Sequence, residues 1–254
     1  MLRTTCGIRT PFPVTDAMSV FRSIVFAAAA AGIFVGLVTT AVQQFGTVPL
    51  ILKAEVYERA AEAAAPSGVT ASGHSGHEHS AAAWEPQDGL ERNLYTAGAN
   101  ILTAIGFSLL LGGFYALRGQ PVSWREGLVW GLAGFAVFTI APGLGLPPEL
   151  PGIPAAPLGA RQLWWIATAF ATAAGIGLFV FRRSTVAAVL GFCLIVAPHL
   201  VGAPQLAEVH TNVPEPLSHQ FAVAVTLTSF LFWMLLGSLT GIAYRRFAEQ
   251  AAKP

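Results

Sequence analysis

Two groups of histidines are the residues whose type and spacing best suit metal binding. His74, His77 and His79, with Glu78 among them, stand in a low-complexity stretch in which we expect no fixed structure. Neutral imidazole is the usual nitrogen ligand for divalent transition metals, and a carboxylate can complete the shell. Because ordering such a loop costs entropy, binding there would be modest and unselective. The pattern predicts metal capture, and a solvated polar linker is the alternative.

The second group surrounds the turn between the last two apolar stretches. An ionisable residue inside a membrane span is costly and is a functional candidate by default. The short turn would bring these residues close together as a metal-entry site. The alternative is that the first histidine caps carbonyls freed by Pro198 while the others are solvated. The group consists of His199, Glu208, His210, Glu215 and His219.

A third candidate is the run from Ala141 to Gly152, which is apolar but too rich in proline and glycine to be regular helix. Irregular backbone at membrane depth must be buried in protein or line a watery cavity. Glu149 would be the one charge there and a further metal ligand, and a rigid structural turn is the alternative. The polar residues Gln43, Gln44 and Asn100 could line a path through the bundle, and hydrogen bonds between helices are the alternative that we favour.

Composition sets the class of protein that must position these residues. The chain has 254 residues, of which 54% are hydrophobic and only 11% are charged. Soluble domains carry about 25% charged residues, so this chain could not cover a water-facing surface. We predict an all-α, polytopic transmembrane bundle whose solvent is the lipid bilayer. No phosphate-binding loop, His-Glu-x-x-His or Gly-x-Ser-x-Gly motif is present, so we expect no enzyme, no prosthetic group and no nucleic-acid partner.

The apolar stretches predict about six membrane spans, since a spanning helix needs about 20 apolar residues. The third and fifth are the shortest, and each ends in Ala-Pro, which predicts a kinked or re-entrant end. Similar starts of the second, fourth and sixth spans suggest three consecutive helical hairpins. The six stretches are Phe21–Val48, Leu94–Leu117, Gly127–Ala141, Gln162–Phe181, Thr185–Val201 and Gln220–Tyr244.

The remaining segments fall outside the spans. Residues 1–20 form a tail whose first 17 residues read as disordered or as the product of an upstream start codon, and residues 21–50 hold the first span. Residues 51–93 form a long outer loop that opens with a helix-prone run, Lys53–Glu62. Residues 94–246 hold spans two to six, and residues 247–254 form a second tail.

The distribution of basic residues predicts the orientation, because cytoplasmic segments of membrane proteins are rich in lysine and arginine. With six spans, one side holds Arg3, Arg9, Arg22, Arg118, Arg125, Arg182, Arg183, Arg245, Arg246 and Lys253. The other side holds only Lys53, Arg59, Arg92 and Arg161. This pattern predicts a bacterial inner-membrane protein with both termini in the cytoplasm and all six histidines outside.

Small residues recur at a spacing of four, which lets helix backbones approach closely in lipid. The pairs are Gly32 and Gly36, Gly127 and Gly131, Ala171 and Gly175, and Gly237 and Gly241. A packed bundle is the simplest reading of these pairs, and the sequence is also compatible with a homo-oligomer.

Several motifs resemble the CbtA family of proposed cobalt transporter subunits. They are Met18–Gly32, the run 141–152, Arg161 with its following tryptophans, Pro198-His199 with Gly202-Ala203-Pro204, and His219-Gln220-Phe221 leading to Phe232-Trp233. The resemblance implies cobalt uptake linked to cobalamin synthesis, about five spans, and a small, single-helix, histidine-bearing partner as the second subunit.

The leading hypothesis is therefore a metal-ion permease subunit. Co²⁺ or a similar divalent ion, as transported ligand, would be collected by the outer histidines and pass near His199, His219 and Glu149. The rival is a non-transporting scaffold or metal-handling subunit of a larger complex. A continuous polar cavity between helices would favour the permease, and a solid apolar core would favour the scaffold.

Overall fold

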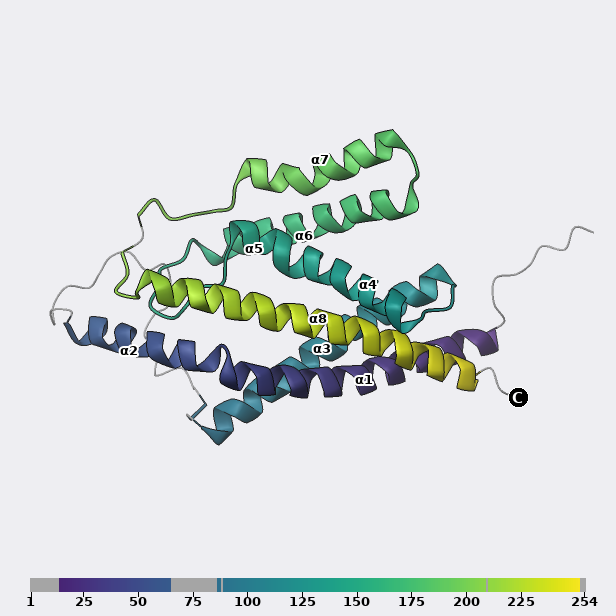
Figure 1. Ribbon diagram of the computed structural model, residues 1–254, viewed down its shortest axis with the longest axis horizontal. Helices are drawn as coiled ribbons and strands as arrows, with labels where there is room; N and C mark the ends of the chain where they lie inside the picture. Colours follow the sequence, from purple (N-terminus) through teal and green to yellow (C-terminus); the bar gives the residue numbers. More distant parts are fainter. Residues whose placement is uncertain (1–13, 65–85, 88, 209, 252–254) are drawn as a thin grey trace, which may run out of the picture.

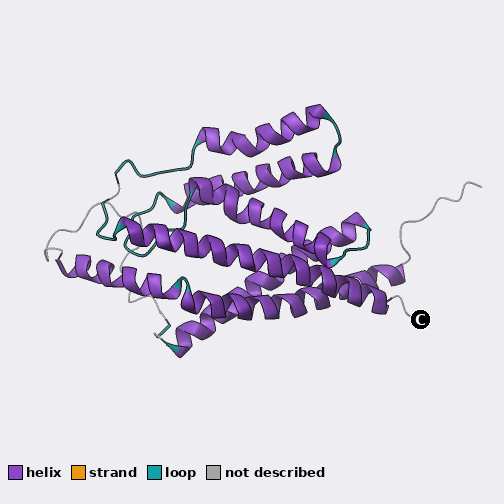
Figure 2. Ribbon diagram, viewed as in Figure 1, coloured by secondary structure: helices purple, strands orange, loops and turns teal. Residues whose placement is uncertain are grey.

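The computed structural model describes residues 14–64, 86–87, 89–208 and 210–251, and every regular element in them is a helix (Figure 2). The prediction of an all-α bundle is confirmed. The elements are α1 (Val14–Phe45), α2 (Val48–Ala64), α3 (Leu90–Arg118), α4 (Trp124–Phe135), the π-helix η1 (Ala136–Ile140), α5 (Ala141–Gly145), α6 (Leu158–Phe181), α7 (Thr185–Val201) and α8 (Glu215–Ala251).

Five stretches of helix are long and apolar enough to cross a membrane: α1, α3, the continuous run α4–η1–α5, α6 and α8. The sixth apolar helix, α7, has 17 residues. At 1.5 Å per residue it is about 25 Å long, just short of a hydrocarbon core of about 30 Å. The long helices and α7 run back and forth along the bundle, so α1 begins and α8 ends at the same end (Figure 1).

We name the two ends of the bundle after the residue types that they carry. The basic end holds the start of α1, the α3–α4 and α6–α7 turns, and the end of α8 (Figure 1). The histidine end holds α2, the start of α3, the segment 146–157, the segment 202–214 and the start of α8 (Figure 1).

Glycines set which helices pack against one another. A Cβ added to Gly36 would lie 2.5 Å from the Cα of Ile101, so α1 and α3 touch backbone to backbone. Gly131 of α4 meets Gly237 of α8 in the same way, and Gly175 of α6 meets Gly191 of α7. The predicted role of small residues in close packing is confirmed at these glycines.

The helix pairs differ in part from the three predicted hairpins. α1 and α3 pack together as predicted, but α4 packs mainly on α8, and α6 packs mainly on α7. The reason is that the glycine faces of α4 and α8 match each other, as do those of α6 and α7. The α6–α7 hairpin consequently joins the rest of the bundle mainly through α5 and η1.

The third span is irregular directly before Pro142, at the end that the Ala-Pro motif predicted to be kinked or re-entrant. It then continues as α-helix to Gly145, so the expectation that the run from Ala141 forms no regular helix was wrong for its first five residues. Pro142 lacks a backbone N–H and its ring crowds the preceding turn. The chain widens there into η1, whose five residues precede α5 directly. In α7 the corresponding Pro198 lies inside the helix, which ends three residues later at Val201.

A second small core fixes the segments at the histidine end. Ala54 of α2, Leu150, Val213, Leu217 and Phe221 form a buried apolar cluster there. Two side chains also tie the loops together: Gln205 donates to the carbonyl of Gly145, and Thr211 to that of Gly152, both at 2.9 Å. This packing holds the segment 146–157, which carries Glu149, against the bundle.

Candidate functional site

A cavity of about 990 Å³ lies between the η1–α5 segment, α6 and α8. We call it the α6–α8 cavity. Its walls are mostly apolar, with an ion pair at the histidine end and four uncharged polar side chains elsewhere. The polar lining residues are Thr139, Glu149, Arg161, Gln162, Thr226 and Ser229. Because pockets of this kind bind small ligands, the cavity is the candidate functional site.

Glu149 and Arg161 form the charged part of this cavity. The Arg161 Nη2 donates to the Glu149 Oε2 at 2.7 Å, and the Arg161 and Glu149 side chains are 28% and 30% exposed, respectively. The Nε atom of Arg161 is buried and makes no hydrogen bond to any described residue. The predicted ligand Glu149 therefore lines the cavity, but its charge is balanced by Arg161, which the sequence did not indicate as its partner.

His199 lies in the last turn of α7 and is half-buried. Its ring meets the Trp164 ring edge-on, with 5.8 Å between centroids, and it makes no hydrogen bond to the described residues. The indole N–H of Trp164, rather than His199, donates to the Pro198 carbonyl at 3.2 Å. Within the described part of the chain, the His199 ring nitrogens are thus left free beside the proline.

The other predicted ligands are spread over the histidine end. His210 and Glu208 lie within 3.2 Å of each other and are largely exposed, and His219 is exposed in the first turns of α8. The described part of the chain brings no three His, Cys, Asp or Glu side chains close enough to hold a metal ion. His74, His77 and His79 lie outside the described residues. Metal binding by these residues stays a prediction.

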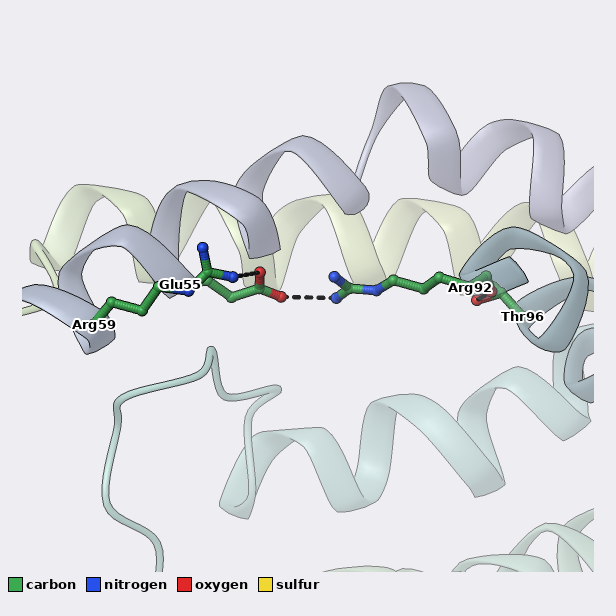
Figure 3. Close-up of polar contacts among 4 residues, drawn as sticks. All are labelled: Glu55, Arg59, Arg92 and Thr96. Atoms are coloured by element: carbon green, nitrogen blue, oxygen red, sulfur yellow. Dashed lines mark hydrogen bonds and ion pairs between the residues drawn. The ribbon is translucent and has the colours of Figure 1, made fainter. Parts of the chain in front are cut away.

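Glu55 of α2 is a second acidic group whose charge is balanced by arginine. Its carboxylate accepts from Arg92 of α3 at 2.7 Å and from Arg59 of α2 at 3.4 Å (Figure 3). The Glu55 side chain is only 16% exposed, so this bridge clamps α2 to the start of α3. Glu55 is accordingly a structural residue in this conformation.

The polar residues of α1 and α3 bind one another. Asn100 donates to Gln43 at 2.7 Å and to Thr40 at 3.0 Å, and Gln44 donates to Asn93 at 2.9 Å. The predicted interhelical hydrogen bonds are confirmed. None of these residues lines the α6–α8 cavity.

Aromatic rings close the inner side of the α6–α8 cavity. Phe138 of η1 lies parallel to Trp233 of α8, with centroids 5.6 Å apart, and stacks on Trp165 of α6 at 6.0 Å. Phe107 of α3 completes this aromatic layer, 5.0 Å from Phe138. Beyond it lies a second cavity of about 310 Å³, which we call the α3–α6 cavity. Sequence reasoning missed the layer because its rings come from four separate elements.

A comparison with protein families decides the class of this molecule. The family model described as probable cobalt transporter subunit (CbtA) matches residues 21–245. The chain belongs to this family. The resemblance seen in the motifs is thereby confirmed, and the family is described as one of probable cobalt transporter subunits. No match to the chain was found among curated proteins or among solved structures.

Proposed function

We propose that this CbtA-family chain is the membrane subunit of a divalent-metal uptake system, and that Co²⁺ enters it through the α6–α8 cavity. The observation that supports the proposal is the cavity itself, which has a carboxylate at the histidine end and polar side chains along its length. In this view the ion displaces the Arg161 guanidinium from Glu149 and meets Gln162 and Thr139 next. Oxygen and nitrogen ligands suit a divalent transition metal.

The proposed orientation places the histidine end outside a bacterial inner membrane. The basic end carries Arg22, Arg118, Arg125, Arg182, Arg183, Arg245 and Arg246, which is the pattern of a cytoplasmic face. His74, His77, His79 and the Glu208–His210 pair would then collect the ion outside, with His199 and His219 beside the entrance. Clustered ligands and acidic charge raise the local cation concentration.

Two parts of the proposal rest on the family resemblance alone. One is that the imported cobalt serves cobalamin synthesis, and the other is that a small, single-helix, histidine-bearing partner completes the system. A metal delivered by such a partner would reach the same cavity, because the charged pair lies at the histidine end of the bundle.

The aromatic layer favours a second candidate function, a non-transporting scaffold or metal-handling subunit. Phe138, Trp165 and Trp233 stack between the partly polar α6–α8 cavity and the apolar α3–α6 cavity, so these rings separate the two cavities. A permease would have to part these rings, whereas a scaffold would keep them closed.

The test is Co²⁺ uptake by vesicles that contain the purified chain, with and without its small partner. Glu149→Gln keeps the shape of the side chain but removes its charge, and should lower uptake at least ten-fold. Glu91→Gln is the matched control, because Glu91 lies in the first turn of α3 at the same end and outside the cavity lining. His199→Ala and His219→Ala test the entrance. Wild-type uptake by Glu149→Gln would remove the cavity from the pathway and favour the scaffold.

A further inference from the structure

The α3–α6 cavity has a lining unlike that of the proposed metal route. It lies on the basic side of the aromatic layer, between α3, α4 and α6, and its volume is about 310 Å³. Every residue of its lining is apolar or aromatic; among them are Leu110, Phe114, Trp130, Gly177 and Phe181. This lining offers no ligand to a hydrated metal ion. It is complementary to an apolar molecule instead.

The cavity is open to the bilayer. Leu110 of α3 and Phe181 of α6 both line it, and they are 61% and 55% exposed on the lipid-facing surface. Gly177 forms part of the α6 wall, and a Cβ built on it would meet no atom within 4 Å. The empty space therefore begins at the α6 backbone and can be reached from the surrounding lipid.

Basic residues stand where this cavity meets the basic end. Arg118 lies one helical turn beyond Phe114, and its guanidinium sits 5.3 Å from the ring centre of Trp130. Its Nη2 donates to Gln120 at 3.1 Å, but its Nη1 is buried without a partner among the described residues. Arg182 directly follows Phe181, is exposed, and makes no ion pair with a described residue.

One acidic group lies near this rim. Glu126 accepts the backbone N–H of Ser123 at 2.9 Å as part of the cap that begins α4, so its carboxylate is held by the helix start. Arg118 and Arg182 carry two positive charges and Glu126 carries one negative charge. The rim beside the apolar cavity therefore has a net positive charge. A lipid with an anionic headgroup has the complementary arrangement of charge and chain.

We propose that the α3–α6 cavity binds an anionic phospholipid, with an acyl chain in the cavity and the phosphate at Arg118 and Arg182. A transmembrane helix is at least about 10 Å wide, and a space of this size holds only a few of its side chains. A flexible acyl chain can enter the space end-on. The bound chain would fill the gap along α6, which packs closely on neither α3 nor α4.

The experiment uses the full chain reconstituted in phosphatidylcholine vesicles and titrated with phosphatidylglycerol whose acyl chains carry bromine. Bromine quenches tryptophan fluorescence on contact, and Trp130 and Trp233 line the cavity. Quenching should saturate at a low fraction of brominated phosphatidylglycerol, and brominated phosphatidylcholine should need roughly 25-fold more. That ratio corresponds to two arginines at about five-fold each, from about 1 kcal/mol per basic residue near anionic lipid.

Three variants separate headgroup binding from chain binding. Arg118→Gln and Arg182→Gln should each weaken the phosphatidylglycerol effect by about five-fold. Arg22→Gln is the control, because Arg22 lies at the same end on α1, which contributes nothing to the cavity. Gly177→Leu fills the cavity and should abolish saturable quenching, whereas Gly106→Leu, at an exposed glycine outside the lining, should not.

Equal quenching by the two lipids, or an unchanged preference in Arg118→Gln and Arg182→Gln, would overturn the proposal. Loss of a dimer in Gly177→Leu, measured by light scattering in detergent, would show that a second copy occupies the cavity and would overturn it as well. These measurements do not involve metal uptake, so their outcome is independent of the proposed transport function.

Discussion

Gly36→Ala tests how closely α1 and α3 are held together. A Cβ at this position would lie 2.5 Å from the Ile101 Cα and 2.7 Å from its backbone nitrogen, whereas ordinary contact begins at 3.4 Å. The clash is with backbone, so no side chain can turn away to relieve it. The two helices must separate by the difference between 3.4 and 2.5 Å, about 0.9 Å.

This separation would also break the hydrogen bonds one turn away. Asn100 lies 2.7 Å from Gln43 and 3.0 Å from Thr40, and about 0.9 Å more takes both beyond hydrogen-bond range. Overpacking costs about 1–3 kcal/mol, and each side-chain hydrogen bond in a membrane contributes about 0.6 kcal/mol. The expected loss in the free energy of unfolding is therefore about 2–4 kcal/mol.

The assay is reversible unfolding in mixed micelles with increasing dodecyl sulfate, followed by circular dichroism. Gly106→Ala on α3 is the control, since a Cβ there meets nothing within 4 Å, and it should stay within about 0.5 kcal/mol of wild type. Asn100→Ala added to Gly36→Ala should cost less than it does alone, because the bonds are already broken. Wild-type stability of Gly36→Ala, or strict additivity with Asn100→Ala, would refute the packing described above.

Two further predictions concern the membrane and the aromatic layer. In whole cells of a variant without native cysteines, a membrane-impermeant maleimide should label Ala207→Cys at the histidine end but not Gln120→Cys at the basic end; the reverse pattern would invert the proposed orientation. Trp165→Ala removes a ring that stacks on Phe138 and should raise Co²⁺ entry into vesicles several-fold; the lost ring–ring contact alone costs about 1 kcal/mol of stability. Unchanged uptake in that variant would mean that the layer is not the barrier.

Hydropathy predicted the existence of the helices well and their starts less well. The predicted bounds of the fifth span, Thr185–Val201, are those of α7, because Arg182 and Arg183 interrupt the apolar run directly before it. α6 and α8 begin four and five residues earlier than predicted, at Leu158 and Glu215. Helical hydrogen bonding already runs through the polar membrane interface, where hydropathy is still low. The helix therefore begins before the apolar pattern does.

The sequence indicated one residue of the candidate site, but it did not indicate which residues contact one another there. Glu149 could be singled out because it is the one charge in an apolar, proline-rich run. Its pairing with Arg161 depends on how the segment 146–157 folds over α6, and that path is fixed by contacts of Leu150 and Thr211 with distant parts of the chain. The rings of Phe138 and Trp165 likewise meet through tertiary packing around η1, which no local pattern in the sequence specifies.

The position of α8 in the chain has a consequence for how the protein is made. α8 is the shared packing partner of α1, α3 and α4, yet it follows all three in the chain and is synthesised after them (Figure 1). Until residues 215–251 enter the membrane, the glycine face of α4 and the α1–α3 pair lack the helix that covers them in the finished bundle. A stop codon just before Glu215 would therefore remove the centre of the molecule rather than its end, and quality-control proteases should clear the truncated chain.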